Sequence, residues 1–96
     1  MTYDTAEIRR AARRVSSVAS EIGSIASSDV GSAVNMIPGN FEGEAATVLR
    51  EELTDFKKDL GKLRDGLNKI ARELLAYARR LEEADRAAEA FIKSNG

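Results

Sequence analysis

A seven-residue hydrophobic repeat runs without interruption through the second half of the chain, and it constrains the fold more than any other feature. Apolar or aromatic residues recur in alternating steps of three and four from Ala46 to Phe91. A repeat sustained for this length is typical of a helix that packs along one seam against other helices. We expect this helix to span residues 42–92, about 75 Å at 1.5 Å per residue. The predicted packing seam consists of Leu49, Leu53, Phe56, Leu60, Leu63, Leu67, Ile70, Leu74 and Tyr77.

A weaker repeat with the same spacing occupies the first part of the chain, from Ile8 to Ile25. It predicts a first helix over residues 5–35. Residues 27–33 are mostly small and have a poorer helix propensity, so the helix is predicted either to continue through residues 28–31 or to break there. The single proline, Pro38, lies in the sequence Ile-Pro-Gly-Asn, which favours a turn over residues 36–41. The chain is therefore predicted to be one all-α domain, residues 1–96, folded as an antiparallel helical hairpin.

The two predicted helices differ in length. When the first helix, about 45 Å long, folds back along the second, about 30 Å of apolar seam stays uncovered. An exposed apolar stripe of this size is unfavourable in water unless another protein surface buries it. A second copy of the chain, or a related hairpin, would complete a four-helix bundle dimer. In the alternative, the tail beyond Tyr77 stays mobile until it meets a partner. In both cases the chain is expected to associate with another helical protein.

Several function classes are excluded by the residues that the chain lacks. There is no Cys and no His, which removes disulfides, thiolate metal sites, and the commonest general base and metal ligand. The seam contains no Glu or His for a di-metal site. We therefore expect no enzyme activity, no catalytic residue, no metal and no cofactor. The N-terminal residues have neither a basic start nor an apolar stretch, so a cleaved signal peptide is not expected, and no apolar run is long enough to insert in a membrane.

One cluster of basic residues leaves two interpretations open. Arg9, Arg10, Arg13 and Arg14 lie on neighbouring strips of the first predicted helix. Four arginines can grip phosphates, which would suit a nucleic-acid-associated helical dimer. The whole chain has a net charge of -1, and no aromatic pattern accompanies the cluster. A solvated helix face, or ion pairs with acidic residues such as Glu82 and Glu83 of a neighbouring chain, is the favoured interpretation, without nucleic acid as a partner.

The bend carries the tripeptide Phe41-Glu42-Gly43, an aromatic-x-Gly motif directly after the turn. With this motif, two helices and the length of the chain, the sequence resembles the WXG family of small type VII secretion substrates and partners, as a divergent branch. Phe41 stands where the family usually has Trp. The resemblance implies a protein made in the bacterial cytoplasm and secreted without a cleaved signal peptide. It acts either as a substrate or as a helical partner of a larger effector, and the implied partners include a secretion ATPase.

The resemblance also implies a C-terminal export signal after the second helix. The family's Tyr-x-x-x-Asp/Glu pattern is absent at Tyr77, since Leu81 holds the acidic position. A hydrophobic version fits instead, with Asp85 as the acidic element, and it consists of Leu81, Asp85, Ala88 and Ile92. Asp85 is otherwise a solvated helix residue, and Phe41 and Gly43 are otherwise a packed bend. The alternative function is a cytoplasmic helical adaptor or chaperone that is not exported.

Overall fold

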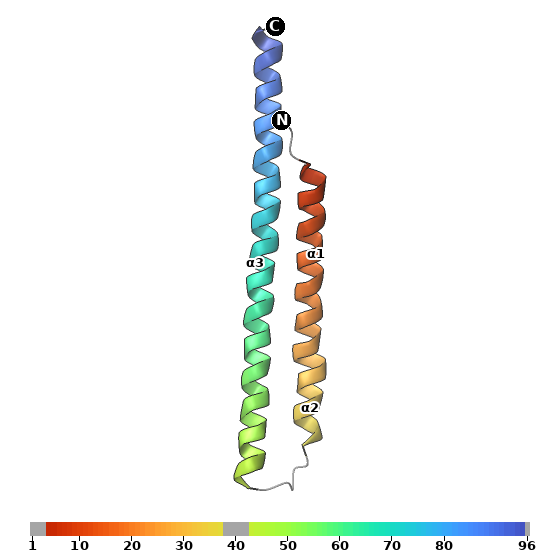
Figure 1. Cartoon of the computed structure of the whole chain (residues 1–96), viewed down its shortest axis with the longest axis vertical. Coiled ribbons are helices and arrows are strands. Elements are labelled where there is room, and N and C mark those ends of the chain that lie inside the picture. Colours follow the sequence, from red (N-terminus) through yellow and green to blue (C-terminus); the bar gives the residue numbers. More distant parts are fainter. Residues whose placement is uncertain (1–3, 38–42, 96) are drawn as a thin grey trace.

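The chain folds as an extended antiparallel hairpin of helices. The computed structural model describes residues 4–37 and 43–95. Its elements are the helix α1 (Thr5–Ser24), the π-helical segment η1 (Ile25–Val30), the helix α2 (Gly31–Met36) and the long helix α3 (Glu44–Asn95). Figure 1 shows α1, η1 and α2 as one arm that runs antiparallel to α3. The hairpin measures 80 × 16 × 15 Å along its principal axes. The predicted all-α antiparallel hairpin is confirmed; the predicted turn lies largely outside the described residues.

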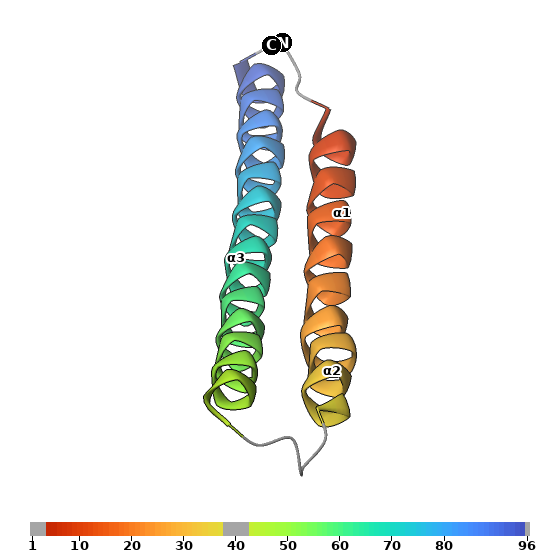
Figure 2. The ribbon, with the colours of Figure 1, turned by 60° about the horizontal axis from the view of Figure 1, so that its bottom comes forward.

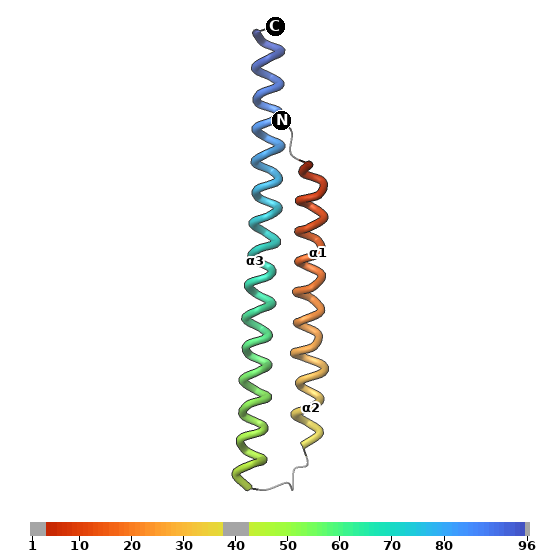
Figure 3. The backbone as a smooth tube through the Cα atoms, viewed as in Figure 1, coloured from red at the N-terminus to blue at the C-terminus, as the bar shows by residue number. Residues whose placement is uncertain are grey.

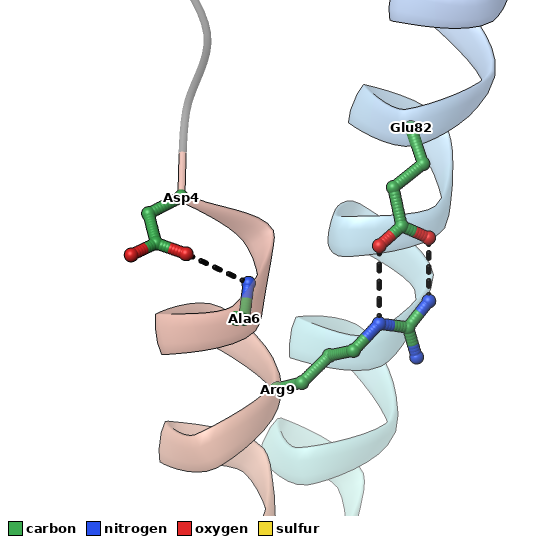
Figure 4. Close-up of polar contacts among 4 residues, drawn as sticks. All are labelled: Asp4, Ala6, Arg9 and Glu82. Atoms are coloured by element: carbon green, nitrogen blue, oxygen red, sulfur yellow. Dashed lines mark hydrogen bonds and ion pairs between the residues drawn. The ribbon is translucent and has the colours of Figure 1, made fainter.

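The first arm begins at a capped helix end. The Asp4 carboxylate accepts a hydrogen bond from the backbone N–H of Ala6 at 3.1 Å, drawn in Figure 4, and another from the backbone N–H of Glu7 at 3.3 Å. The Ala6 N–H has no backbone acceptor within the described residues, and the Glu7 N–H also donates to the Asp4 carbonyl oxygen at 3.1 Å; an acidic N-cap of this kind stabilises a helix end by about 1 kcal/mol. The cap explains why the helix begins at Thr5.

The arm remains helical through residues 28–31, where the sequence left open a continuous helix or a break. Residues Ile25–Val30 adopt a π-helical segment, whose turns are wider than those of an α-helix. The Ser27 hydroxyl donates a hydrogen bond to the Gly23 carbonyl oxygen at 3.0 Å, a local bond that competes with regular α-helical pairing. Figure 3 shows the arm as an uninterrupted coil through this segment. The small residues therefore loosen the helix without ending it.

The interior between the two arms is built almost entirely from alanine. In the described residues, the buried side chains are Ala12, Ala19, Ala26, Val30, Ala46, Ala71 and Ala78. Ala12, Ala19 and Ala26 on the first arm, and Ala71 and Ala78 on α3, are spaced seven residues apart, which keeps each set on one side of its helix. Small side chains at the contact allow two helices to pack closely. The two arms lie side by side in both views of the ribbon (Figures 1 and 2). The bulky apolar residues are consequently left outside this interior.

Candidate functional site: an apolar association face

The predicted packing seam of α3 divides into two columns with different exposure. The inner column is half-buried and consists of Leu53, Leu60, Leu67 and Leu74. The outer column is exposed and consists of Leu49, Phe56, Leu63, Ile70 and Tyr77, whose exposed fractions are 43, 50, 50, 46 and 43%. Residues within each column are seven apart, so each column runs straight along the helix. The hairpin alone therefore covers only one edge of the seam.

The position of the alanines explains this division. Ala71 and Ala78 each follow an inner-column leucine by four residues, and they face the other arm. The outer column lies on the opposite side of the inner column, farther from that arm. Sequence periodicity indicated the apolar seam but did not indicate that alanines would take the closest contact. The seven-residue spacing of Ala12, Ala19 and Ala26 is the sequence signal from which the alanine contact could have been predicted.

The first arm contributes to the same face of the hairpin. Ile8, Val15 and Ile22 are half-buried, and each precedes a buried alanine by four residues. On α3 as well, the half-buried leucines precede the buried alanines by four residues. Because the two arms are antiparallel, the half-buried column of the first arm and that of α3 therefore lie on the same side of the hairpin. Ile25, 43% exposed, adds a bulky apolar residue next to them. We call the two columns of α3, together with Ile8, Val15, Val18, Ile22 and Ile25, the apolar face.

The apolar face widens near the start of α3. A surface hollow with a volume of about 740 Å³ is lined there by Glu44, Ala45, Val48, Leu49 and Glu52. Val48 is 44% exposed, although it belongs to neither column. Carboxylates border this apolar hollow, so the wider end of the face is acidic at its rim.

The bend motif is only partly within the described residues. Phe41 lies outside them. Gly43 has a φ of +114°, a backbone conformation that glycine adopts without the steric penalty of a Cβ atom. Its carbonyl oxygen accepts hydrogen bonds from the backbone N–H of Thr47 at 3.3 Å and from the Thr47 hydroxyl at 3.4 Å. Gly43 therefore sets the direction in which the chain enters α3.

The residues of the predicted export signal lie at the free end of α3. Leu81 is half-buried, whereas Asp85, Ala88 and Ile92 are exposed. Ile92 is 68% exposed and its neighbour Phe91 is 69% exposed. The reason is that α3 continues to Asn95 past the beginning of α1, as Figure 1 shows. The export role of these four residues stays a prediction.

Asp85 and Ile92 lie in the part of the alanine column of α3 that extends beyond the first arm. They continue the seven-residue column of Ala71 and Ala78, which are buried against the first arm. Beyond the start of α1 this column has no arm to face, so an acidic and an apolar side chain replace alanine there. The projecting end of α3 therefore presents a surface that the hairpin does not cover.

The arginine cluster is divided among different environments. Arg9 donates two hydrogen bonds to Glu82 of the same chain, from Nη2 to Oε1 at 2.6 Å and from Nε to Oε2 at 3.1 Å (Figure 4). Arg10 lies 3.9 Å from Glu7, and Arg13 and Arg14 are exposed. The favoured interpretation was a solvated helix face, or ion pairs with acidic residues such as Glu82 and Glu83 of a neighbouring chain. For Arg9 this was wrong, because antiparallel packing places Glu82 of the same chain beside the first turns of α1.

The ion pair also shifts the acid–base behaviour of both groups. Hydrogen bonds from Arg9 and from the Thr5 side chain lower the pKa of Glu82 below its ordinary value of 4.5. The Glu82 carboxylate in turn raises the pKa of Arg9. Both side chains are about one-third exposed, so the pair fixes the register of the arms more than it stabilises them.

The described parts of the chain contain neither a metal-binding cluster nor a membrane-spanning helix. Residues 4–37 and 43–95 contain no group of three or more acidic residues placed to hold a metal ion. None of the helices within these residues is long and apolar enough to span a membrane. The apolar face and the projecting end of α3 are therefore the features to explain.

Comparisons with known proteins identify the family. No curated protein and no solved structure matched the chain. The sequence model of the family described as "WXG100: Proteins of 100 residues with WXG" matches residues 1–86. Proteins of this family are non-enzymatic helical hairpins, typically dimeric, that are secreted by type VII systems. Because the match covers most of its length and the fold agrees, the chain belongs to the WXG100 family of type VII secretion substrates.

Proposed function

We propose that the chain pairs through its apolar face with a second helical hairpin, in the first instance another copy of itself, and is exported as that pair. The observation that carries the proposal is the outer column of α3, five bulky side chains that are 43 to 50% exposed. Soluble monomers rarely expose a continuous apolar surface of this length. A second hairpin would cover it by the packing rules of a four-helix bundle.

The alanine interior supports an obligatory partner. In the described residues no bulky side chain is fully buried, so the hairpin alone gains little of the 1.5–3 kcal/mol that burial of one Leu or Phe typically contributes. Long helices without a packed apolar side draw little stability from propensity alone. Pairing through the apolar face would supply the missing burial. Association is thus part of folding in this proposal.

Export is assigned to the projecting end of α3. Asp85 and Ile92 lie past the start of α1 and are exposed, so a component of the secretion machinery can reach them without unfolding the hairpin. A carboxylate beside apolar side chains offers a partner both a charge to pair with and a hydrophobic anchor. The proposed roles are Asp85 as the charged element and Leu81, Ala88 and Ile92 as the apolar element.

The first experiment is light scattering of the purified chain over a dilution series. A mass of two chains that persists on dilution supports the homodimer. A mass of one chain would contradict self-pairing. In that case, co-purification from the native bacterium identifies the partner, and a larger effector with a helical segment would make this chain its escort. A cytoplasmic adaptor predicts, instead, that no chain appears in the culture medium.

A further inference from the structure

A groove lies between η1 and α3 on the side of the hairpin away from the apolar face. Its volume is about 410 Å³, and its lining includes Gly23, Ser27, Thr54, Lys57, Lys58 and Arg64. An adjoining hollow of about 450 Å³ shares Ser27, Thr54 and Lys57 and extends along the arm to Asn35. We call the two together the basic groove.

Its position follows from the sequence of α3. Lys57 and Arg64 belong to the same seven-residue column as Ala71 and Ala78. Long cationic side chains thus stand at the closest contact between the arms, where alanines stand farther along the helix. They face small residues, Gly23 and Ser27, on the other arm. On each arm the half-buried apolar column precedes the alanines by four residues, whereas Gly23 follows Ala19 by four residues. Gly23 therefore lies on the other side of the alanines, and the groove opens on the side of the hairpin opposite the apolar face.

The side chain of Arg64 packs directly against the backbone of Gly23 on the other arm. A Cβ atom at Gly23 would lie 3.1 Å from Cδ of Arg64, so the stem of Arg64 lies against the glycine backbone. Its guanidinium group contacts Asp65, with Nη2 3.0 Å from Oδ1. Both side chains of this pair are well exposed, at 44 and 70%, and exposed pairs of this kind are weak and readily exchanged.

The charge of the basic groove is of one sign. Lys57, Lys58 and Arg64 line it, and no carboxylate is among the lining residues of either hollow. Within the described residues, neither Lys57 nor Lys58 takes part in an ion pair. The chain as a whole has a net charge of -1. Two lysines without an ion pair, together with Arg64, whose acidic contact is the exposed Asp65, therefore form a local concentration of positive charge that attracts anionic groups.

Gly61 lines the groove at a cost to helix stability. Glycine in a helix interior is less favourable than alanine by about 1 kcal/mol. Its backbone does not need glycine, since Gly43 is the only described glycine with a positive φ. A Cβ atom at position 61 would meet nothing closer than Nη2 of Arg64, at 3.9 Å. Packing thus leaves room for a side chain here, and any such side chain would occupy the groove.

We propose that the basic groove binds an acidic, extended peptide segment of a partner protein. Lys57 and Arg64 are seven residues apart, about 10.5 Å along α3. Three residues of an extended chain span about the same distance, so carboxylates at every third residue match the cations. The lining contains no aromatic ring on which a nucleic acid base would stack. The proposal is independent of pairing through the apolar face, because the groove lies on the other side.

The test uses the full chain and a fluorescein-labelled peptide, Glu-Gly-Gly-Glu-Gly-Gly-Glu, in fluorescence anisotropy at low salt. The double variant Lys57→Gln/Lys58→Gln should bind this peptide roughly fivefold more weakly, since two exposed charge contacts are lost. The matched control is Lys62→Gln/Lys69→Gln, which removes the same charge from exposed positions of α3 outside the groove. Its affinity should stay within about twofold of the parent chain.

A second pair of variants separates the shape of the groove from its charge. Gly61→Leu should raise the melting temperature, because leucine favours the helix, while it lowers the affinity for the peptide by blocking the groove. Gly66→Leu is the matched control, since a Cβ atom at Gly66 meets nothing within 4 Å and Gly66 does not line the groove. It should raise the melting temperature with unchanged peptide affinity.

Three results would overturn the proposal. The first is an equal loss of binding in Lys62→Gln/Lys69→Gln, which would mean attraction to surface charge in general. The second is unchanged peptide affinity in both Lys57→Gln/Lys58→Gln and Gly61→Leu. The third is tighter binding of a single-stranded oligonucleotide than of a peptide of equal charge, which would make nucleic acid the ligand. None of these outcomes depends on whether the protein is a dimer or is secreted.

Discussion

Arg9 and Glu82 are 73 positions apart in the sequence, yet their side chains form a two-point ion pair, with Nη2–Oε1 at 2.6 Å and Nε–Oε2 at 3.1 Å. Two parallel hydrogen bonds between guanidinium and carboxylate are directional as well as charged. The pair lies near the beginning of α1, just before α3 projects beyond it. It therefore fixes how far the first arm extends along α3 and which residues of the tail stay uncovered.

The stability contributed by this pair should depend on pH. The pKa of Glu82 is lowered in the folded chain, so its contribution is present above the unfolded pKa, near 4.5, and is lost as pH falls through the lower folded value. Glu82→Gln should therefore lower the melting temperature at pH 7, and the difference from the parent chain should shrink below about pH 4. Thermal unfolding followed by circular dichroism measures this. Glu83→Gln, at an exposed neighbouring position, is the control, and an equal effect in both variants would contradict a specific pair.

The proposed pairing predicts that Ile70→Asp prevents association. Ile70 is 46% exposed in the hairpin, so the hairpin itself tolerates a charge there, whereas a paired hairpin would bury it without a partner. We expect the dimer to weaken by at least about a hundredfold, as for a central interface residue. Light scattering on dilution measures the mass, and circular dichroism follows the loss of helix that should accompany dissociation, since association is part of folding in the proposed function. Ser20→Asp, exposed on α1 outside the apolar face, should leave the mass unchanged; a stable Ile70→Asp dimer would contradict the proposed face.

The alanine interior predicts sensitivity to larger side chains. Ala19 is fully buried between the arms, so Ala19→Leu should force them apart and destabilise the fold by about 1–3 kcal/mol. Chemical unfolding followed by circular dichroism gives the free energy of unfolding. The same change at Ala90, an exposed position of α3, should have little effect. A stabilised Ala19→Leu variant would mean that the arms are not in close contact there.

The proposed export role predicts that Asp85→Ala abolishes secretion in a bacterium that carries the type VII system. Alanine favours the helix, so helix content and oligomeric mass should not fall. The measurement is immunoblotting of culture medium and cell lysate, and Glu83→Ala is the control for loss of one exposed carboxylate. Normal export of the Asp85 variant would remove this residue from the signal.

The heptad repeat and Pro38 were sufficient to predict two antiparallel helices, because periodicity records which side of a helix avoids water. The same repeat did not distinguish the inner from the outer column of α3. Both columns are apolar, and their difference depends on which residues contact the first arm. Phe41 and most of the predicted turn lie outside the described residues, and the export role of Asp85 stays a prediction.

Two polar features of the structure could not be predicted from the sequence. The arginine cluster was expected to be a solvated patch or to pair with another chain, whereas Arg9 pairs with Glu82 of its own chain. Lys57 and Arg64 look in the sequence like ordinary exposed charges of a long helix. Only the antiparallel register places them opposite Gly23 and Ser27 and so creates the basic groove. Neither relationship can be obtained from spacing within one helix.

The sequence by itself determined that this protein is helical, bends once, and carries an apolar surface too long for one hairpin to cover. These are local properties, set by residue spacing, helix propensity and the proline. The tertiary structure decided that alanines form the interior, that Leu49, Phe56, Leu63, Ile70 and Tyr77 remain exposed, and where α3 projects beyond α1. These depend on the rotation and register of one helix against another, which are fixed by side chains far apart in the chain.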